Sequence, residues 1–255
     1  MSHLMNNYGR LPVSFDHGQG VWLWDKEGHK YLDALAGIAV NSVGHAHPRL
    51  VRAIADQASK LIHCSNYFNI DLQEKVAEKL VEHSGLEAVF FCNSGLEANE
   101  CAIKIARKFG HAKGIEVPNI IVLKHAFHGR SIATLSATGN PSVREDFSPY
   151  TEGFIFVDES DLDGIRKIVE ENKNVVAIFF EPILGEGGVV PIDLSVIKGI
   201  REICDEHDLL MMCDEVQCGM GRSGKWFAHQ WAEIKPDVIT MAKGLAGGVP
   251  VGAVI

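Results

Sequence analysis

Two charged residues stand directly after apolar segments, where they could take part in chemistry. Lys243 follows "DVITMA" and precedes small residues and glycines, and Asp214 follows "LLMMC". Charged side chains are rarely buried without a partner, and desolvation lowers the pKa of a lysine and makes its amine nucleophilic. Lys243 could therefore form a Schiff base, and Asp214 could pair with a cationic ring nitrogen. A surface lysine and a structural salt bridge are the alternatives.

Three other apolar segments also end in polar or glycine-rich sequence. "AVFFC" is followed by Asn93 and Ser94, "NIIVLK" by residues 125–130, and "VVAIFF" by Glu181 and the run at 185–188. In open α/β sheets, ligands bind beyond the carboxyl ends of the strands. If all five segments are strands of one sheet, their polar ends meet at one edge. That convergence, rather than any single motif, predicts a site.

The turn at Ser94, Gly95 and Leu96 could hold a phosphate. It lies between an apolar segment and a helical one, where free backbone amides and the helix dipole favour an anion. An ordinary serine N-cap is the alternative, and the glycines match neither a Walker loop nor a dinucleotide fingerprint. Farther along, Phe127 and Arg130 in "FHGR" offer an aromatic face and a cation, although a core phenylalanine and a solvated arginine fit equally well.

Four histidines occur in pairs with a spacing found at some metal sites. They are His125 and His128, spaced HxxH, and His45 and His47 in "GHAHP". No carboxylate or cysteine completes a ligand set at a recognisable spacing, so we predict no metal site. We expect these histidines to act in turns or to support other residues of the site.

Regular elements that could position these groups begin near residue 48. Helical periodicity covers 48–63, 71–83, 96–110, 161–172 and 194–208, and short apolar segments cover 88–92, 119–124, 153–157, 175–180, 209–213 and 237–242. The segments are apolar at consecutive positions, as expected for strands covered on both faces. Their alternation with helices predicts an α/β domain with a mostly parallel sheet.

Local signals indicate where several elements begin and end. Asp71 and Glu74 have the spacing of a capping box, Ser160 and Asp163 give a second capping signal, and Gly85 follows the end of a predicted helix. Nearer the N-terminus, "GVWLWDKEGHKYLDAL" predicts two short strands around a Lys-Glu-Gly turn.

The composition limits the classes of partner. The chain has 255 residues, 46% of them hydrophobic, and a formal net charge of −9, which argues against nucleic acid or an anionic membrane. No apolar run approaches the roughly 18 residues of a membrane span, and the first residues lack the apolar core of a secretion signal. The six cysteines form no C-x-x-C pair, which favours a reduced, cytoplasmic protein. Met1 and Met5 are both possible natural starts.

One cofactor, pyridoxal 5′-phosphate, requires a Schiff-base lysine, a carboxylate at a pyridine nitrogen, a phosphate site and an aromatic ring together. The sequence closely resembles the class III, ornithine-type aminotransferases that use this cofactor. The resemblance is carried by six stretches that follow the family's order along nearly the whole chain. They are "YGRLPVSFDHGQGVWLWDKEGHKYLDALAGIAVNSVGHAHP", "FFCNSGLEANECAIKIARK", "AFHGRSIATLSATG", "EPILGEGGVVP", "DEVQCGMGRSGKWFAHQ" and "PDVITMAKGLAGGVPVGAV". The opening "YGRLPV" and the "FFCNSG" block are most similar to the branch that acts on acetylornithine.

The resemblance implies a role for each candidate residue. It implies cofactor contacts for Ser94, Gly95, Leu96, Phe127, Asp214, Glu215, Val216, Gln217 and Lys243, and substrate contacts for Arg130 and Glu186. The implied catalytic residues are Lys243, which binds the cofactor covalently and moves a proton, and Asp214, which pairs with the pyridinium nitrogen. Gln217 is implied to lie near the ring hydroxyl and Arg130 to bind the substrate α-carboxylate. Leu96 departs from the small or hydroxyl-bearing residue expected there, so only its amide can serve a phosphate.

The resemblance also implies a fold and an assembly. The expected fold is the fold-type I major domain, in which helices sandwich a mostly parallel mixed sheet. Residues 1–47 are expected to be an N-terminal segment of the small domain. Residues 48–255 are expected to be the cofactor-binding major domain, incomplete at its C-terminus and lacking the C-terminal small domain. We therefore expect a truncated chain of an enzyme that acts as a homodimer.

The implied reaction moves the terminal amine of N2-acetylornithine to 2-oxoglutarate. It gives N-acetylglutamate 5-semialdehyde and glutamate, as a step of arginine biosynthesis. Ornithine, succinylornithine and 4-aminobutyrate are alternative amino donors. A non-catalytic cofactor-binding protein, and an aminomutase or decarboxylase of the same family, are the remaining alternatives.

Overall fold

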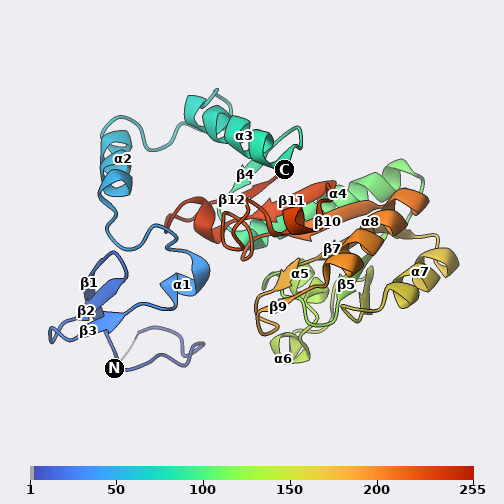
Figure 1. Ribbon diagram of the computed structural model, residues 1–255, viewed down its shortest axis with the longest axis horizontal. Coiled ribbons are helices and arrows are strands. Elements are labelled where there is room, and N and C mark those ends of the chain that lie inside the picture. The colour runs from blue at the N-terminus through green and yellow to red at the C-terminus, as the bar shows by residue number, and fades with distance from the viewer. Residues whose placement is uncertain (1–2) are drawn as a thin grey trace. The chain divides into compact units, whose positions relative to one another are not determined.

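The structure is a computed structural model that describes residues 3–255 (Figure 1). Its contacts divide the chain into two compact units, Met1–Ser65 and Asn66–Ile255. The boundary expected after residue 47 comes from the family resemblance and stays a prediction. Among residues 3–255, every helix is too short or too polar to cross a bilayer.

The first unit contains a three-stranded antiparallel sheet followed by two helices. Its elements are β1 (Phe15–Gln19), β2 (Trp22–Asp25), β3 (Lys30–Leu32), α1 (Ala36–Ala39) and α2 (Pro48–Ala58). The predicted hairpin is confirmed as β2 and β3. Asp25 stabilises its turn by accepting hydrogen bonds from the His29 amide at 2.8 Å and the Tyr31 hydroxyl at 2.9 Å. We did not predict β1, because its sequence "FDHGQ" lacks alternating apolar residues.

The second unit is built on a seven-stranded sheet with the order β4–β12–β11–β10–β7–β5–β6. Its strands are β4 (Phe90–Cys92), β5 (Asn119–Leu123), β6 (Phe154–Val157), β7 (Val175–Phe180), β10 (Leu210–Asp214), β11 (Val238–Met241) and β12 (Gly252–Val254). A separate hairpin pairs β8 (Ile183–Leu184) with β9 (Val190–Pro191). The six apolar segments predicted as strands are therefore confirmed.

The strand directions determine where the strands end. From β6 through β5, β7 and β10 to β11, every neighbouring pair is parallel. Strand β12 is antiparallel both to β11 and to β4, so β4 again runs in the direction of β11. The sheet is thus mixed and mostly parallel, as expected. The carboxyl ends of β4, β5, β7, β10 and β11 all lie at the same edge.

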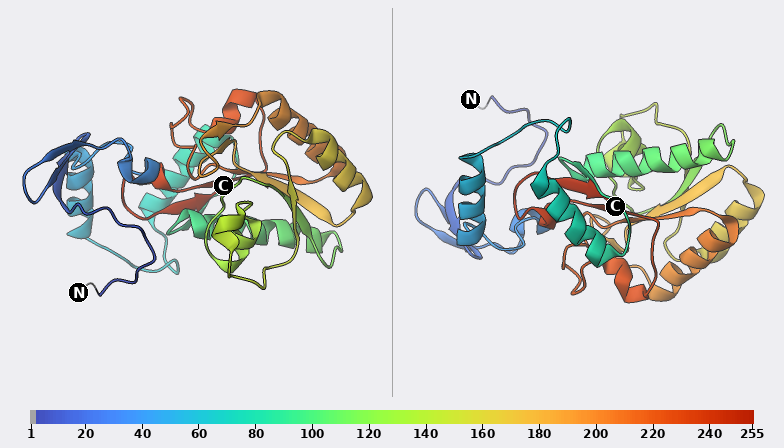
Figure 2. Two further views of the ribbon diagram at one scale, coloured as in Figure 1. Left: turned by 90° about the horizontal axis from the view of Figure 1, so that it is seen from below. Right: turned by 90° about the horizontal axis from the view of Figure 1, so that it is seen from above.

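Helices cover both faces of this sheet (Figure 2). On one face lies α4 (Gly95–Ala112), whose buried residues pack with Ile120 and Val122 of β5. On the other face lie α7 (Leu162–Glu171) and α8 (Leu194–His207), which pack with Ile121 and Leu123. Because neighbouring residues point to opposite faces, strands buried on both sides need consecutive apolar residues. Burying each large apolar side chain contributes about 1.5–3 kcal/mol.

The remaining helices of the second unit are short, except for α3. They are α3 (Asp71–Ser84), α5 (Ile132–Ala137) and α6 (Pro141–Arg144), together with the 3-10 segments η1 (Ala228–Ala232) and η2 (Lys243–Leu245).

Two predicted helix caps were wrong, and one predicted helix end was right. The N-cap of α3 is Ile70 without a side-chain hydrogen bond, so Asp71 is already helical and forms no capping box. The cap of α7 is Asp161, which accepts from the Gly164 amide at 2.8 Å, rather than Ser160. Gly85 ends α3 with a φ of +72°, the left-handed conformation that favours glycine.

Candidate active site

The polar groups predicted to converge do follow strands that end at one edge of the sheet. Ser94 follows β4, residues 125–130 follow β5, Glu181 follows β7 and Lys243 follows β11, whereas Asp214 is the last residue of β10. Because these five strands share one direction, the predicted convergence of strand ends is confirmed.

The loop after β4 contacts the loops after β5 and β10. A Cβ atom added to Gly95 would lie 2.6 Å from Val216 Cγ1, so only glycine allows this approach. A Cβ added to Gly129, in the β5 loop, would lie 3.5 Å from the Leu96 Cβ. The predicted phosphate turn is therefore packed against both of its neighbours.

The loop after β8 also contacts the loops after β5 and β10. A Cβ on Gly185 would clash with the Gln217 side-chain amide, which places Gln217 directly against this loop. A Cβ on Gly187 would lie 2.8 Å from the carbonyl oxygen of His125. These contacts join residues 185–188 to the loops after β10 and β5.

Asp214 is buried and held by groups from three elements. Its Oδ2 accepts a hydrogen bond from Asn99 Nδ2 on α4 at 2.7 Å and lies 2.8 Å from His128 Nδ1. Its Oδ1 accepts from the Val216 amide at 3.0 Å. Asn99 also donates to the His128 carbonyl at 2.7 Å, and the His128 ring stacks on Phe179 with centroids 4.1 Å apart. The carboxylate is thus fixed in place, while Oδ1 has one protein donor and can accept another.

Lys243 is half-buried and begins η2 with a φ of +43°. This left-handed conformation is uncommon for a residue with a side chain, and such strain is concentrated at functional sites. Burial lowers the pKa of Lys243, although the negative charges of Asp214 and Glu186 act in the opposite direction. The lysine therefore lies within electrostatic reach of Asp214 and holds its proton less tightly than a solvated lysine.

The turn at the start of α4 is capped by Ser94 and also leaves two backbone amides free within the described part of the chain. The Ser94 hydroxyl accepts from the Glu97 amide at 3.2 Å, which makes it an ordinary N-cap. Within residues 3–255, the amides of Gly95 and Leu96 have no hydrogen-bond partner. A helix of 18 residues begins here, so two free donors and the positive end of the dipole are available to an anion.

The two predicted substrate residues are exposed, in contrast to Asp214. Arg130 and Glu186 are both exposed, and the Arg130 guanidinium lies 5.7 Å from the Phe127 ring centroid. Phe127 itself is half-buried. The site therefore has a buried carboxylate at its base and solvent-facing charged groups at its rim.

Glu215 supports the site through the backbone. Its carboxylate accepts hydrogen bonds from the Ala228 amide at 2.7 Å and the His229 amide at 2.8 Å. Its own amide donates to the Thr240 carbonyl at 2.9 Å. All of these groups are used within the chain, so Glu215 fixes the loop after β10 against η1 rather than offering a free polar group.

Two residues of the site were missed by the sequence analysis, and both are buried and polar. Asn99 lies next to Ala98 on the buried side of α4, and a polar residue within that apolar face is the signal that could have revealed it. Glu181 directly follows a predicted strand, but its sequence context alone predicts no role for it. Its Oε1 accepts from the Phe127 amide at 2.7 Å and its Oε2 from the Gly185 amide at 3.0 Å.

Three of the four paired histidines have side-chain partners within the described residues. His125 Nδ1 lies 2.9 Å from Glu159 Oε2, and His45 Nε2 lies 2.6 Å from Asp33 Oδ2. In the described part of the chain, no three His, Cys, Asp or Glu side chains are placed to hold a metal ion. His128, beside Asp214, supports a residue of the site, as expected for this group.

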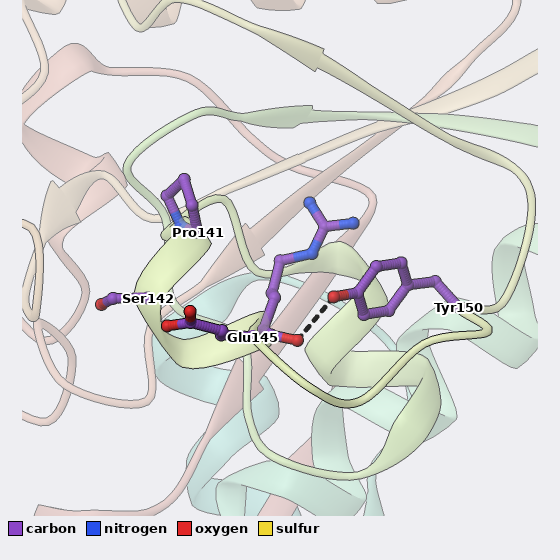
Figure 3. Close-up of a pocket in the computed structure, with 5 residues that line it drawn as sticks. Pro141, Ser142, Glu145 and Tyr150 are labelled. Atoms are coloured by element: carbon purple, nitrogen blue, oxygen red, sulfur yellow. Dashed lines mark hydrogen bonds between the residues drawn. The ribbon is translucent and has the colours of Figure 1, made fainter.

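A pocket of about 410 Å³ lies on α6 and the segment that follows it (Figure 3). Pro141, Ser142, Glu145 and Tyr150 line it together with Arg144. The Tyr150 hydroxyl donates to the Arg144 carbonyl at 2.5 Å. The pocket contains none of the residues predicted for the site.

A family model described as aminotransferase class-III matches residues 4–255. The chain belongs to the class-III aminotransferase family. It is 54% identical over 253 residues to an acetylornithine aminotransferase from Nitrosomonas europaea, covering 99% of this chain and 64% of that protein. An acetylornithine aminotransferase from Synechocystis is 50% identical over 260 residues, and the match covers 61% of that protein. The resemblance inferred from the sequence is therefore confirmed.

Solved structures give the same family. The ornithine aminotransferase of Toxoplasma gondii matches with a TM-score of 0.94 at 34% identity, covering 99% of this chain and 61% of that one. The N-acetylornithine aminotransferase of Stenotrophomonas maltophilia matches with a TM-score of 0.84 at 40% identity, covering 97% and 62%. The fold is the class III aminotransferase fold, of fold type I. The chain spans less than two thirds of the length of these relatives.

The residues at the sheet edge fit the cofactor of this family. Class III aminotransferases depend on pyridoxal 5′-phosphate, and one Toxoplasma gondii structure contains it in partial occupancy at the active site. Asp214 Oδ1 can accept from a pyridinium nitrogen, the free amides of Gly95 and Leu96 suit a phosphate, and Lys243 supplies an amine of lowered pKa. The donor and acceptor chemistry of these residues thus matches that of the cofactor.

Proposed function

We propose that the chain is the cofactor-binding part of an aminotransferase that moves the terminal amine of N2-acetylornithine to 2-oxoglutarate. The products are N-acetylglutamate 5-semialdehyde and glutamate, which places the reaction in arginine biosynthesis. One observation carries the proposal. A half-buried lysine of lowered pKa follows β11, and a buried carboxylate ends the neighbouring parallel strand β10, in a chain 54% identical to an acetylornithine aminotransferase.

The proposed cofactor contacts follow from the groups left free in the structure. The amides of Gly95 and Leu96 would bind the phosphate, Phe127 would contact the ring and Gln217 would serve its hydroxyl. Asp214 accepts the ring N–H and stabilises its positive charge. When bound, the cofactor supplies a carbonyl for the amine and a ring that accepts electrons. Asn99 and His128 keep the Asp214 carboxylate in position for this contact.

Lys243 is the proposed acid and base of the reaction. Its lowered pKa leaves more of the amine unprotonated at neutral pH, as a nucleophile and a base both require. In the proposed cycle its Nζ would take a proton from the reacting carbon of the amino donor. In the second half of the reaction it would give a proton to the carbon of 2-oxoglutarate that receives the amine. The carboxylates around it favour the protonated form between these steps.

The proposed substrate contacts are exposed, as an open site requires. Arg130 binds the α-carboxylate, because a guanidinium forms two parallel hydrogen bonds with a carboxylate. Glu186 sets the preference for the rest of the donor, because its charge lies close enough to influence Lys243. Both residues belong to loops that contact each other through Gly187 and His125.

Ornithine is the second candidate donor, favoured by one observation. The ornithine aminotransferase of Toxoplasma gondii matches with the higher TM-score, 0.94 against 0.84 for the acetylornithine enzyme of Stenotrophomonas maltophilia. Sequence identity favours acetylornithine instead, because the chain is 40% identical to the Stenotrophomonas maltophilia enzyme and 34% identical to the Toxoplasma gondii enzyme. Succinylornithine and 4-aminobutyrate complete the set of donors to be compared.

The proposal includes an assembly and a location. A homodimer in the cytoplasm is expected from the family resemblance, with no nucleic-acid or membrane partner. The net charge of −9 supports the last point, and the described cysteines are all free thiols, as a reducing compartment favours. Sedimentation equilibrium of the purified protein measures the assembly directly.

The experiment adds pyridoxal 5′-phosphate to the chain and records its visible absorption. We expect a cofactor band that is absent in Lys243→Ala. Glutamate formation from 2-oxoglutarate is then measured with each of the four donors, both for this chain and for the longest reading frame that contains it. Fastest transfer from acetylornithine supports the proposal, and fastest transfer from ornithine supports the second candidate. A cofactor band without transfer from any donor refutes both.

A further inference from the structure

A buried carboxylate at the end of β7 joins two loops of the candidate site. Glu181 is 4% exposed, and each of its oxygens accepts one backbone hydrogen bond. The Phe127 amide donates to Oε1 at 2.7 Å, and the Gly185 amide donates to Oε2 at 3.0 Å. The donors belong to different loops, one after β5 and one after β8, so the carboxylate bridges them.

The bridged loops carry residues from both ends of the proposed site. Residues 125–130 include Phe127, and residues 185–188 include Glu186. The loops also touch directly, because a Cβ on Gly187 would lie 2.8 Å from the His125 carbonyl oxygen. A shift of either loop would therefore change the spacing between the proposed ring contact and the proposed substrate contact.

The surroundings of Glu181 make its burial costly. Its titratable neighbours are Asp214 on β10, His128 in the β5 loop, Lys243 on η2 and Cys218 in the β10 loop. Burial, and next the negative charge of Asp214, raise the pKa of Glu181 to about 7, whereas His128 and the two amide hydrogen bonds lower it. An apolar residue would avoid this desolvation but would leave both loop amides without an acceptor. The hydrogen bonds to the Phe127 and Gly185 amides are thus the reason why a carboxylate, rather than an apolar side chain, suits this position.

We propose that Glu181 is a positioning residue that couples the cofactor end of the site to its substrate end, through Phe127 and Glu186. The inference rests on the proposed function for what those two residues bind. Glu181 itself acts through the two backbone amides and has no contact with the reacting atoms. Because a single carboxylate accepts both hydrogen bonds, neither loop can move without affecting the other.

Three variants of the 255-residue chain separate this role from general stabilisation. Glu181→Gln keeps the side-chain size but has one acceptor oxygen for two amides, and Glu181→Ala has none. Glu159→Gln is the matched control, because Glu159 follows β6 and hydrogen-bonds the His125 ring, whereas both loop amides donate to Glu181.

Two measurements are made on each variant. Hydrogen–deuterium exchange of the cofactor-free chain reports the protection of the two loops. Circular dichroism induced in bound pyridoxal 5′-phosphate reports the orientation of the ring, which a residue that only stabilised the fold would not change. The exchange of α4 and α8 reports whether the variant is folded.

We expect exchange in at least one loop of Glu181→Gln, and in both loops of Glu181→Ala, to be about tenfold or more faster than in the unmodified chain. Exchange in α4 and α8 stays unchanged, the induced dichroism per bound cofactor falls, and Glu159→Gln matches the unmodified chain. Unchanged loop exchange in Glu181→Ala overturns the bridge. Faster loop exchange with unchanged dichroism overturns the coupling. An unmodified chain that binds no cofactor refutes the proposed function, which the exchange data do not depend on.

Discussion

Asn99 offers a direct test of how the Asp214 carboxylate is supported. Asn99 is 2% exposed and donates from one amide nitrogen to Asp214 Oδ2 and to the His128 carbonyl, both at 2.7 Å. A hydrogen bond to a charged acceptor contributes about 1.5–3 kcal/mol and a neutral one about 1 kcal/mol. Removing the amide oxygen, which lacks a partner among the described atoms, offsets about 1 kcal/mol. We therefore expect Asn99→Ala to lower the free energy of unfolding by about 1.5–3 kcal/mol.

Urea unfolding at neutral pH measures this change, and thermal unfolding should show a midpoint lower by about 5–10 °C. Gln73→Ala is the control, because the Gln73 amide makes one exposed hydrogen bond, to Asn66 at 3.4 Å. Its free energy of unfolding should stay within about 0.5 kcal/mol of the unmodified chain. If Asn99→Ala is as stable as that control, the hydrogen bonds from α4 do not hold Asp214, and the reasoning about the site's base is wrong.

Three further outcomes follow from the same geometry. Gly95→Ala should lower stability by about 1–3 kcal/mol and weaken cofactor binding, because its Cβ would lie 2.6 Å from Val216 Cγ1; unchanged affinity in an absorption titration would contradict this packing. Glu181 binds its proton more tightly in the native state, with a pKa of about 7 against an ordinary 4.5, so its contribution to stability is complete below pH 4.5 and is lost as the pH rises through 7. Urea unfolding of the cofactor-free chain should therefore lose about 2–3 kcal/mol more between pH 5 and pH 8 than Glu181→Gln does, and equal pH dependence would disprove the raised pKa. Glu215→Gln should destabilise the chain, since one amide oxygen cannot accept from both the Ala228 and His229 amides; a free energy of unfolding equal to that of the unmodified chain would show that these bonds contribute nothing.

Much of the sheet could be predicted because its strands are buried on both faces. Every residue of β7 is buried, so the consecutive apolar residues of "VVAIFF" follow from the position of the strand in the middle of the sheet. Strand β12 was not predicted as a separate element. Its three residues, "GAV", are too short and too small to give a pattern, and their place comes from pairing with β11 and β4.

The ends of strands predicted the edge at which the site lies, but not the contacts within it. Asn99 and Asp214 are 115 positions apart, and Phe127 and Glu181 are 54 apart. No local pattern encodes a hydrogen bond over such a separation, because it depends on how whole elements pack. The predicted cap of α7 was wrong by one residue, because Ser160 and Asp161 are adjacent and both residue types can cap a helix.

In the proposed site, strand ends distant in sequence meet around one cofactor, to which Lys243 is attached. The most direct test reduces the protein with borohydride in the presence of pyridoxal 5′-phosphate and locates the modified lysine by peptide mass spectrometry. We expect the modification on Lys243, and its loss from that peptide in Lys243→Ala. Modification spread over surface lysines, with Lys243 unmodified in the folded protein, would contradict the account.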